Sequence, residues 1–425
     1  MGAKWSFHPT VAGQLEIAYS SLTLRPNHCN SLIDDLRPAH PPLTLNPAMN
    51  LSSFSLPLAA IASLAVLAAV SLNDATEVAL RLVPVLGFAA GMSVVVNLAA
   101  RVHTFEWLVG ALQRTTSRRE IVLAGFLALC VAATAFLSLD TTAIMLTPLA
   151  VQLASRFRLP VPAVALSVVW IANFASMPLP VSNLTNLLAV GGDAFSTTGE
   201  YVKLAAAPAA VAVAVAVAAS YAARAIYRSA AAEPMPEASS ILPRPTGALA
   251  VLGVTVVALL SPIPYWLTST VAAIAMWCAV GPTGRRDGIT PLIPWSALSL
   301  ATAFSAVATL ALQISDISSA VQQLAGTHPL AIAAAGATTA NAINNIPAFL
   351  MLEPAVSDPA SVLALLIGVN VGPVITPWAS LATLLWADQL RRAKAPVPWR
   401  GFILWGLLLT PVTVIAATAA LLAVA

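Results

Sequence analysis

The main pattern along the chain is a series of long apolar stretches separated by short polar segments. Nine of these stretches reach or approach the roughly 20 residues that a helix needs to cross the hydrocarbon core of a bilayer. Few charged residues interrupt them. We therefore predict about nine crossings, over residues 51–72, 82–100, 161–190, 201–227, 247–260, 265–280, 294–314, 361–388 and 402–424.

Two further apolar segments carry polar residues at their centres, where a spanning helix should be most apolar. The segments cover residues 120–156 and 329–352, and their polar centres cover residues 139–142 and 341–347. We interpret each as a re-entrant hairpin that returns to its own side of the membrane. A kinked ordinary span is the alternative, because both leave a similar hydropathy trace.

The basic residues sort to one side of this predicted topology. Lys and Arg accumulate in the cytoplasmic loops of membrane proteins. One side carries Arg101, Arg114, Arg118, Arg119, Arg156, Arg158, Arg224, Arg228, Arg244, Arg285, Arg286, Arg391, Arg392, Lys394 and Arg400. The other carries Arg81 and Lys203 with the acids Asp74, Glu77, Asp193, Glu200, Asp316, Glu353 and Asp358. The first side is therefore predicted to be cytoplasmic, for a multi-pass protein of the inner (plasma) membrane.

Composition supports a membrane protein and excludes an ordinary soluble domain. Hydrophobic residues make up 59% of the 425 positions and charged residues 9%, against roughly 25% charged residues in soluble domains. The net charge of +3 gives no reason to expect a nucleic-acid partner. The three cysteines show no metal-ligand spacing, so we expect neither a metal nor a cofactor.

The first 50 residues are polar and contain no apolar run long enough to span or to act as a signal peptide. We predict a disordered cytoplasmic tail, or a start placed upstream of the true one at Met49. The remaining chain divides into a first transport repeat over residues 51–228, a cytoplasmic linker over 229–246, and a second, inverted repeat over 247–425.

Two matching segments indicate this internal repeat. Residues 176–188 and 376–385 each contain proline, then Ser-x-x-Thr, then a leucine pair, and the two Ser-x-x-Thr motifs are 198 positions apart. Inverted repeats with interrupted helices at matching places mark the binding sites of many secondary transporters. The predicted fold is thus an all-α polytopic inverted-repeat transporter with two re-entrant hairpins and two broken helices.

Proline supplies the predicted breaks. In the middle of a membrane helix it removes a backbone hydrogen bond and clashes with the preceding turn, and the residues assigned this role are Pro178, Pro180, Pro347 and Pro377. The restarting half-helices are predicted to begin at Ser182 and Ser380, where a hydroxyl can cap the first amides and the helix dipole presents a positive end to the site.

Asp140 is the only carboxylate that the predicted topology places deep in the membrane, where a charged group is costly and usually functional. It is the candidate proton carrier. A sodium ion held by Asp140, Asn183, Asn345 and freed carbonyls is the rival scheme, and a permanently protonated structural aspartic acid is the third.

The predicted substrate site is polar but uncharged. Its candidate residues are Thr141, Thr142, Asn173, Ser182, Thr185, Asn186, Asn341, Asn344, Asn370, Thr376, Ser380 and Thr383. No Lys or Arg falls near them, so a neutral polyhydroxy solute is easier to hold than an anion.

At these positions the sequence resembles the ArsB-type arsenical pump membrane proteins, in the superfamily that also holds sodium-coupled dicarboxylate and sulfate carriers. The most specific segments are residues 140–148, 175–187, 344–347 and 372–386. The resemblance implies export of arsenite or antimonite, as neutral hydroxides in exchange for protons, sometimes with a soluble ATPase. This chain departs from the family at four positions. The family usually has Asn where this chain has Leu139, Asp where it has Asn173 and Asn370, and Lys where it has Val374. These differences leave the coupling ion and the substrate open.

The function predicted from the sequence is proton-coupled efflux of arsenite-like metalloid hydroxides, with a small inorganic solute and protons or sodium as ligands. The alternatives are a sodium-coupled dicarboxylate or sulfate carrier and a cation/proton antiporter of the same superfamily. An enzyme is not expected, because no paired acid and base or metal ligands fall at membrane depth. A soluble ATPase and a second copy of the chain are the candidate protein partners.

Overall fold

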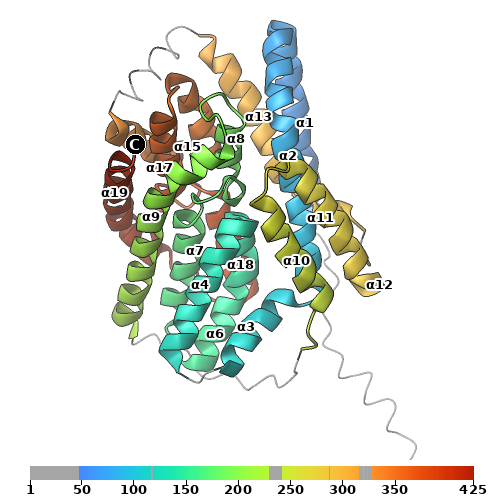
Figure 1. The fold of residues 1–425 in the computed structure, drawn as a ribbon, viewed down its shortest axis with the longest axis vertical. Helices are drawn as coiled ribbons and strands as arrows, with labels where there is room; N and C mark the ends of the chain where they lie inside the picture. Colours follow the sequence, from blue (N-terminus) through green and yellow to red (C-terminus); the bar gives the residue numbers. More distant parts are fainter. Residues whose placement is uncertain are drawn as a thin grey trace, which may run out of the picture. The chain divides into compact units, whose positions relative to one another are not determined.

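The computed structural model describes residues 47–115, 118–228, 242–286, 288–314, 319, 323 and 328–425. Every regular element in these residues is helical, so the all-α prediction is confirmed for the described part of the chain. The predictions for the tail over residues 1–46, for linker residues 229–241 and for Asp316 lie outside it. Residues Ser52–Ala425 form one compact unit, and Figure 1 shows its helices.

Helices occupy all nine predicted crossings. The uninterrupted ones are α1 (Pro47–Val70), α2 (Leu72–Arg101), α9 (Thr198–Ile226), α10 (Thr246–Leu259), α11 (Tyr265–Ala279), α13 (Trp295–Leu312) and α19 (Trp399–Leu422). The two broken ones are α7 (Val161–Phe174) with α8 (Leu184–Val190), and α17 (Pro359–Val371) with α18 (Leu381–Arg392). Among the described helices, five are long and apolar enough to cross a membrane alone.

Helix α2 begins ten residues before the predicted crossing, at Leu72 rather than at residue 82. Ser71 caps it, because the Ser71 hydroxyl accepts a hydrogen bond from the Asp74 amide at 3.3 Å. The added turns carry the polar residues Asn73, Asp74, Glu77 and Arg81 among apolar ones, and a hydropathy pattern does not detect them. One consequence is that Arg81 stands on a helix rather than in a loop.

A short amphipathic helix that the crossing pattern did not predict, α3 (Thr104–Thr115), follows α2. His103 has a φ of 58° and turns the chain between the two helices. Phe105 and Val109 of α3 are buried, while Arg114 is exposed. The helix therefore has one face against the protein and one polar face, as the alternation of its residues at helical spacing requires.

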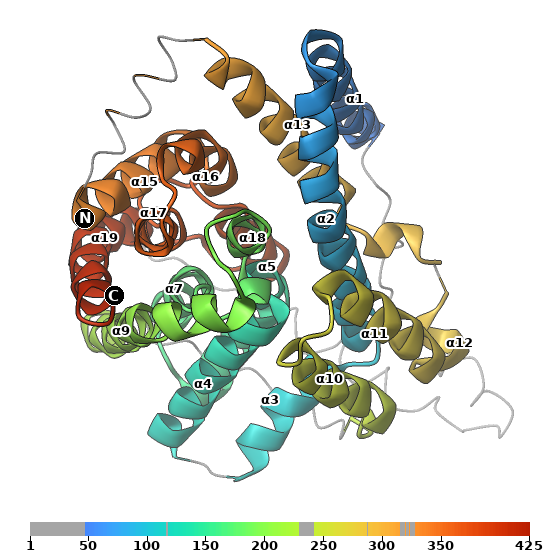
Figure 2. The ribbon, with the colours of Figure 1, turned by 45° about the horizontal axis from the view of Figure 1, so that its top comes forward.

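The helices of this unit pack in two groups, which Figure 2 separates clearly. In one group α2 packs against α11 and α13, and α10 packs against α11. In the other, α9 packs against α7 and α19, and α17 packs against α15 and α19. The breaks and the hairpins belong mainly to the second group, so that group positions the candidate site.

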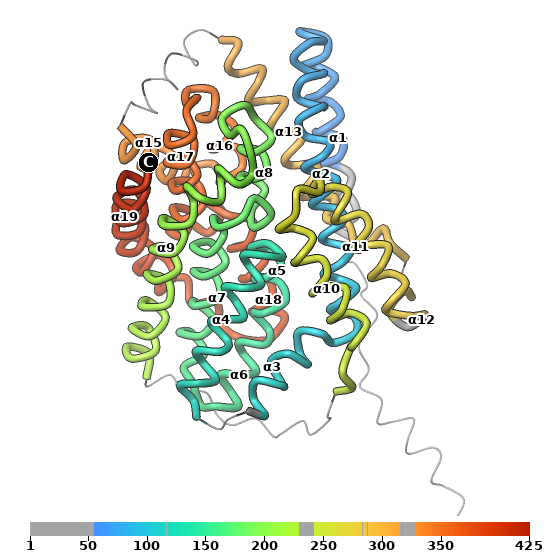
Figure 3. The backbone as a smooth tube through the Cα atoms, in the orientation of Figure 1, coloured from blue at the N-terminus to red at the C-terminus, as the bar shows by residue number. Residues whose placement is uncertain are grey.

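Both predicted hairpins are present. The first runs through α4 (Arg119–Leu137), α5 (Leu139–Thr141), the π-helical turn η1 (Thr142–Leu146) and α6 (Thr147–Phe157), and the second through α15 (Pro329–Ile343) and α16 (Asn345–Leu352). The chain turns at Ser138 and Asn344, whose φ angles are 112° and 93°. Figure 3 shows the two hairpins toward opposite ends of the unit, as an inverted repeat requires.

Helices α15 and α17 cross at a close backbone approach. A Cβ atom on Gly368 would lie 2.2 Å from the carbonyl oxygen of Ala333, and a Cβ atom on Gly336 would lie 3.3 Å from the Cα atom of Gly368. Small residues allow membrane helices to pack backbone to backbone, because lipid provides no hydrophobic drive for their association. The crossing therefore requires glycine at position 368.

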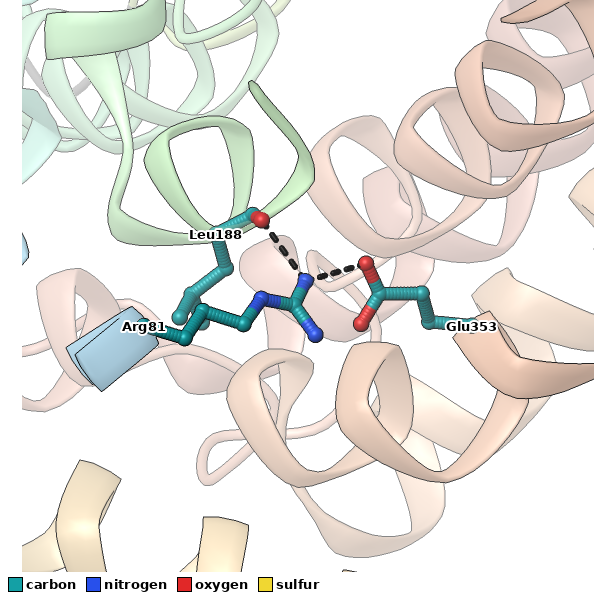
Figure 4. Close-up of polar contacts among 3 residues, drawn as sticks. All are labelled: Arg81, Leu188 and Glu353. Carbon is teal, nitrogen blue, oxygen red and sulfur yellow. Dashed lines mark hydrogen bonds and ion pairs between the residues drawn. The ribbon is translucent and has the colours of Figure 1, made fainter. Parts of the chain in front are cut away.

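Arg81 of α2 connects the two helix groups. Its guanidinium donates a hydrogen bond to the carbonyl oxygen of Leu188 in α8 at 2.7 Å and forms an ion pair with Glu353 (Figure 4). Glu353 begins the short 3-10 helix η5 (Glu353–Ala355), directly after α16. Burial raises the pKa of the Glu353 carboxyl, and Arg81 offsets part of that rise. Acidification therefore protonates the Glu353 carboxylate, and so breaks its ion pair with Arg81, at a higher pH than it would protonate an exposed glutamate.

Replacing Gly368 with alanine should destabilise the protein by about 1–3 kcal/mol, because the new methyl group meets backbone that cannot move aside without separating α15 from α17. The measurement is thermal unfolding of the purified protein in detergent. Gly253→Ala on α10 is the matched control, since nothing lies within 4 Å of its Cβ position. Equal melting temperatures for the two variants would contradict the proposed crossing.

Removing either partner of the Arg81–Glu353 pair should lower stability by about 1–3 kcal/mol, between the values for exposed and buried pairs. Their side chains are 29% and 14% exposed, so the remaining charge is partly desolvated. Charge reversal at both positions together should recover part of the loss seen for Glu353→Arg alone. If the double reversal melts no higher than that single variant, the pair does not join the two helix groups.

Candidate functional site

The first break is the segment between α7 and α8, and protein groups satisfy its freed carbonyls. The Tyr201 hydroxyl donates to the Met177 oxygen at 2.6 Å. The Asn186 side-chain amide donates to the oxygens of Ser176 and Leu179 at 2.7 and 3.1 Å. Irregular backbone inside a membrane protein needs such partners. Asn186, predicted to bind substrate, therefore has a structural task as well.

The second break, between α17 and α18, is held mainly by Asn341 of α15. The Asn341 side-chain oxygen accepts from the amides of Ile375 and Thr376 at 3.2 and 3.0 Å. Its amide group donates to the Gly372 oxygen at 2.8 Å, and the Thr376 hydroxyl donates to the Asn341 carbonyl at 2.7 Å. The structure brings Asn341 and Thr376 together, but their contacts hold the backbone of the second break. Substrate binding by these two residues stays a prediction.

The tip of the second hairpin docks on the same break. The Asn344 side-chain amide donates to the Trp378 oxygen at 2.8 Å, and the Asn345 backbone amide donates to the Ala379 oxygen at 2.9 Å. The Trp378 indole in turn donates to the Ala342 oxygen at 3.1 Å. This tip is therefore fixed to its own break by reciprocal bonds.

Pro347 does not interrupt a helix, so the prediction that it is a helix breaker was wrong. The turn lies at Asn344, and Pro347 is the third residue of α16. The first turn of a helix has no intrahelical partner for its amides, and a proline there costs little. Pro178, Pro180 and Pro377, in contrast, all lie within the breaks.

The restart of the first half-helix was predicted one residue too early. Asn183, not Ser182, is the cap of α8, and its side-chain oxygen accepts from the Thr185 amide at 3.4 Å. Ser182 belongs to the short 3-10 turn η2 (Pro180–Ser182) and bonds back to Leu179. Ser380 does occupy the cap position of α18, but its hydroxyl makes no capping bond.

The corrected caps change the register of the internal repeat. Asn183 and Ser380 are 197 positions apart, not the 198 that the Ser-x-x-Thr motifs predict. The same spacing pairs Asn173 with Asn370, near the ends of α7 and α17. It also pairs Thr185 with Ala382 and Asn186 with Thr383. The first member of each of these pairs lies near the start of α8, and the second lies near the start of α18.

We name the contact of Asn370 of α17 with the start of α8 the closed seam. The Asn370 side-chain oxygen accepts from the Asn183 amide group at 2.8 Å and from the Thr185 hydroxyl at 2.7 Å. The Asn370 amide group donates to the Asn186 side-chain oxygen at 2.7 Å. All four side chains are buried, so every polar group of Asn370 is used to join the two breaks.

The corresponding position in the repeat, which we name the open seam, consists of Asn173 of α7 and of Ser380 and Thr383 near the start of α18, a helix that packs against α7. Asn173 donates only to the Val169 oxygen of its own helix, at 2.8 Å. The side-chain oxygens of Asn173, Ser380 and Thr383 are all buried and have no hydrogen-bond partner among the described residues. Buried polar atoms are normally paired with protein, ordered water or a bound ion, so these three oxygens make the open seam a candidate ligand site.

The two helices of the open seam are in contact. Helix α18 packs against α7, and the Trp386 indole donates to the Ala165 oxygen at 2.8 Å. From this contact, Ser380 lies six residues back along the chain of α18 and Asn173 lies eight residues forward along α7. In antiparallel helices these two directions coincide, so at roughly 1.5 Å per residue Ser380 and Asn173 reach similar heights. The side chains opposite Asn173 are shorter than those opposite Asn370: Ser380, Ala382 and Thr383 replace Asn183, Thr185 and Asn186. This difference in length explains why the open seam does not close.

Asp140 stands on α5, beside the open seam. Helix α5 packs against both α7 and α18, and one Asp140 carboxylate oxygen is buried without a partner among the described residues. Within the predicted polar centre at residues 139–142, Asp140 lies two residues after the turn of the hairpin, which is at Ser138, the counterpart of Asn344. Asp140 therefore stands on an element that packs against the two helices carrying Asn173, Ser380 and Thr383.

Neighbouring threonines support this hairpin. The Thr141 hydroxyl donates to the Leu137 oxygen at 3.0 Å, and Thr142 accepts from the Thr134 hydroxyl at 2.9 Å. Thr134 was not predicted, and its place in an apolar helix gave no signal. Thr141 and Thr142 therefore fix the hairpin in this structure, whereas a contact with substrate stays a prediction.

The electrostatics of the site depend on a single acid. The breaks and the hairpin tips contain no Lys or Arg, and no described charged residue is fully buried as a whole. No three His, Cys, Asp or Glu side chains come together in the described part of the chain. The oxygens of the open seam are hard ligands, suited to a proton or an alkali cation rather than to a transition metal.

Asn370→Ala should cost more stability than Asn173→Ala, although the two residues occupy corresponding positions. The first substitution strands three buried partners, at about 1–3 kcal/mol each, whereas the second removes one bond worth roughly 1 kcal/mol. Thermal unfolding of both variants in the same detergent measures the difference. Equal losses would show that the two seams do not differ.

Comparison with known proteins identifies the family. A family model described as citrate transporter matches residues 48–383, which include both hairpins and both breaks. No curated protein matches the chain. The match and the apolar helices indicate a multi-pass secondary transporter of the citrate or anion type, while an arsenical pump is not confirmed. The chain belongs to the citrate transporter family.

Proposed function

We propose that this protein is a cation-coupled carrier of small carboxylate anions, and not an enzyme, with the coupling cation bound at the open seam. The observation that carries the proposal is the set of buried, unpartnered oxygens on Asp140, Asn173, Ser380 and Thr383. Three packed elements, α5, α7 and α18, supply them. One carboxylate and three neutral oxygens suit a sodium ion or a transferable proton.

The charge of Asp140 explains why a cation is needed. A buried carboxylate without a counter-charge is strongly unfavourable, so it must bind a cation or take up a proton. No Lys or Arg in the breaks or tips can serve as a fixed partner. The cation is therefore free to leave on one side of the membrane and to be replaced on the other, as a carrier requires.

The same shortage of fixed positive charge couples the substrate to the cation. Family membership favours an anion, yet the lining of the breaks consists of amides and hydroxyls. An anion in this region gains favourable charge interactions only after Asp140 has been neutralised. The physical consequence is obligatory joint binding, which links the gradient of the cation to movement of the substrate.

A neutral metalloid hydroxide such as arsenite is the second candidate substrate. The uncharged lining favours it, because an uncharged polyhydroxy solute needs only hydrogen-bond partners, and Asn370 and Val374 place no charge near the second break. In that case a proton on Asp140 would exchange for the solute. The two candidates share the site but differ in substrate charge and in the direction of coupling.

Purified protein in proteoliposomes should accumulate labelled citrate under an inward gradient of sodium ions or protons. Asp140→Asn should abolish accumulation against a gradient, because the asparagine can neither hold a proton nor neutralise a cation. Asp388→Asn is the matched control, since Asp388 is paired with Arg392 at the exposed end of α18. The control variant should transport as the wild type does.

Each substrate receives its own assay. Arsenite movement driven by a proton gradient, with no citrate uptake under either cation, would replace the first candidate substrate by the second. Accumulation that survives Asp140→Asn would falsify the role of the open seam, whichever solute moves. Equal uptake with and without a cation gradient would point to a passive channel instead.

A further inference from the structure

A cleft of about 490 Å³ lies at the ends of α4, α7 and α9, far along these helices from the breaks. Its lining includes Arg119, Glu120, Arg158, Tyr221, Arg224 and Arg228. Four arginines in one cleft are unusual in a chain with so few charged residues. Neither the breaks nor the proposed coupling site uses any of them.

The only carboxylate in the lining is already neutralised. Both terminal nitrogens of Arg224 donate to Glu120, one to each carboxylate oxygen. Among the residues that the structure describes, Arg119, Arg158 and Arg228 form no ion pair within the cleft. The cleft therefore carries three positive charges that its own residues do not balance, which creates a strong field for an anion.

The backbone places two of these arginines where other residues would be favoured. Arg119 is the first residue of α4, at the positive end of a helix, where an acidic residue is normally preferred. Arg158 follows α6 with a φ of 52°, a conformation that usually selects glycine. A bound anion would compensate the repulsion at Arg119 and give a reason for an arginine at position 158.

The surroundings of the cleft place it at the level of lipid headgroups. Helix α9 is one of the helices apolar enough to cross the membrane, and Ile226 near its end is 65% exposed. Tyr221, one turn closer to the membrane centre, lines the cleft and is 36% exposed. Aromatic residues of this kind gather at the membrane interface. All these arginines lie on the side predicted to be cytoplasmic.

We propose that this cleft binds the phosphate of an anionic phospholipid from the cytoplasmic leaflet. Arginine suits phosphate because its planar guanidinium can donate two parallel hydrogen bonds to the phosphate oxygens. The exposed apolar residues beside the cleft offer a surface for acyl chains, which a free phosphate ion would not use. A lipid bound here touches the first hairpin, the α6–α7 turn and α9 together.

The test uses the full-length protein in detergent, with phosphatidylglycerol, phosphatidylcholine or inorganic phosphate added in separate arms. Phosphatidylglycerol should raise the melting temperature clearly more than phosphatidylcholine does, and native mass spectrometry should show it bound. The double variant Arg158→Gln with Arg228→Gln should bind it about twenty-five-fold more weakly, a factor of roughly five for each arginine removed. High salt should weaken binding in the wild type.

Arg286→Gln with Arg391→Gln is the matched control, because it removes the same charge from exposed positions on the same predicted side. This control should keep the affinity of the wild type. Affinity that is unchanged in the cleft variant, or equally reduced in the control, would overturn the proposal. Stabilisation by inorganic phosphate equal to that by the lipid would assign the cleft to a soluble phosphate compound and overturn the lipid assignment.

Discussion

Satisfaction of backbone hydrogen bonds at the two helix breaks is the constraint on which the site depends. A break in a membrane helix frees amides and carbonyls that neither lipid nor bulk water can pair. The Asn341 side chain binds three main-chain groups of the second break, and Tyr201 and Asn186 bind carbonyls of the first. These side chains determine where the breaks lie. The remaining polar groups are then available to bind a ligand.

The sequence predicted the coarse fold because its signals are strong and local. Runs of apolar residues located the crossings, and polar centres located both hairpins. The details that failed depend on exact register. A shared Ser-x-x-Thr motif suggested a spacing of 198, whereas the caps at Asn183 and Ser380 give 197, because asparagine caps a helix as well as serine does. Pro347 was misjudged because its cost depends on its distance from a helix start.

Some site residues could not be predicted because they matter only through contacts distant in sequence. Arg81 and Glu353 were counted as loop charges, and nothing local shows that they pair. The two seams are a similar case. Asn173 and Asn370 have the same side chain in corresponding places, and only the residues opposite them decide that one is fully bonded and the other is not.

The inequality of the two seams agrees with the demands on a carrier built from two inverted units. If both seams closed as the Asn370 seam does, every polar group would be used in holding the breaks together, and Asp140 would have no uncommitted neighbours. If both stayed open, the two breaks would lose the side-chain bonds that join them to each other. One closed seam gives a fixed frame, and one open seam leaves buried oxygens beside the single acid. The sequence difference behind this inequality is small: Asn183, Thr185 and Asn186 on one side correspond to Ser380, Ala382 and Thr383 on the other, and under the proposed function it separates the side chains that hold the breaks from those that bind the cation.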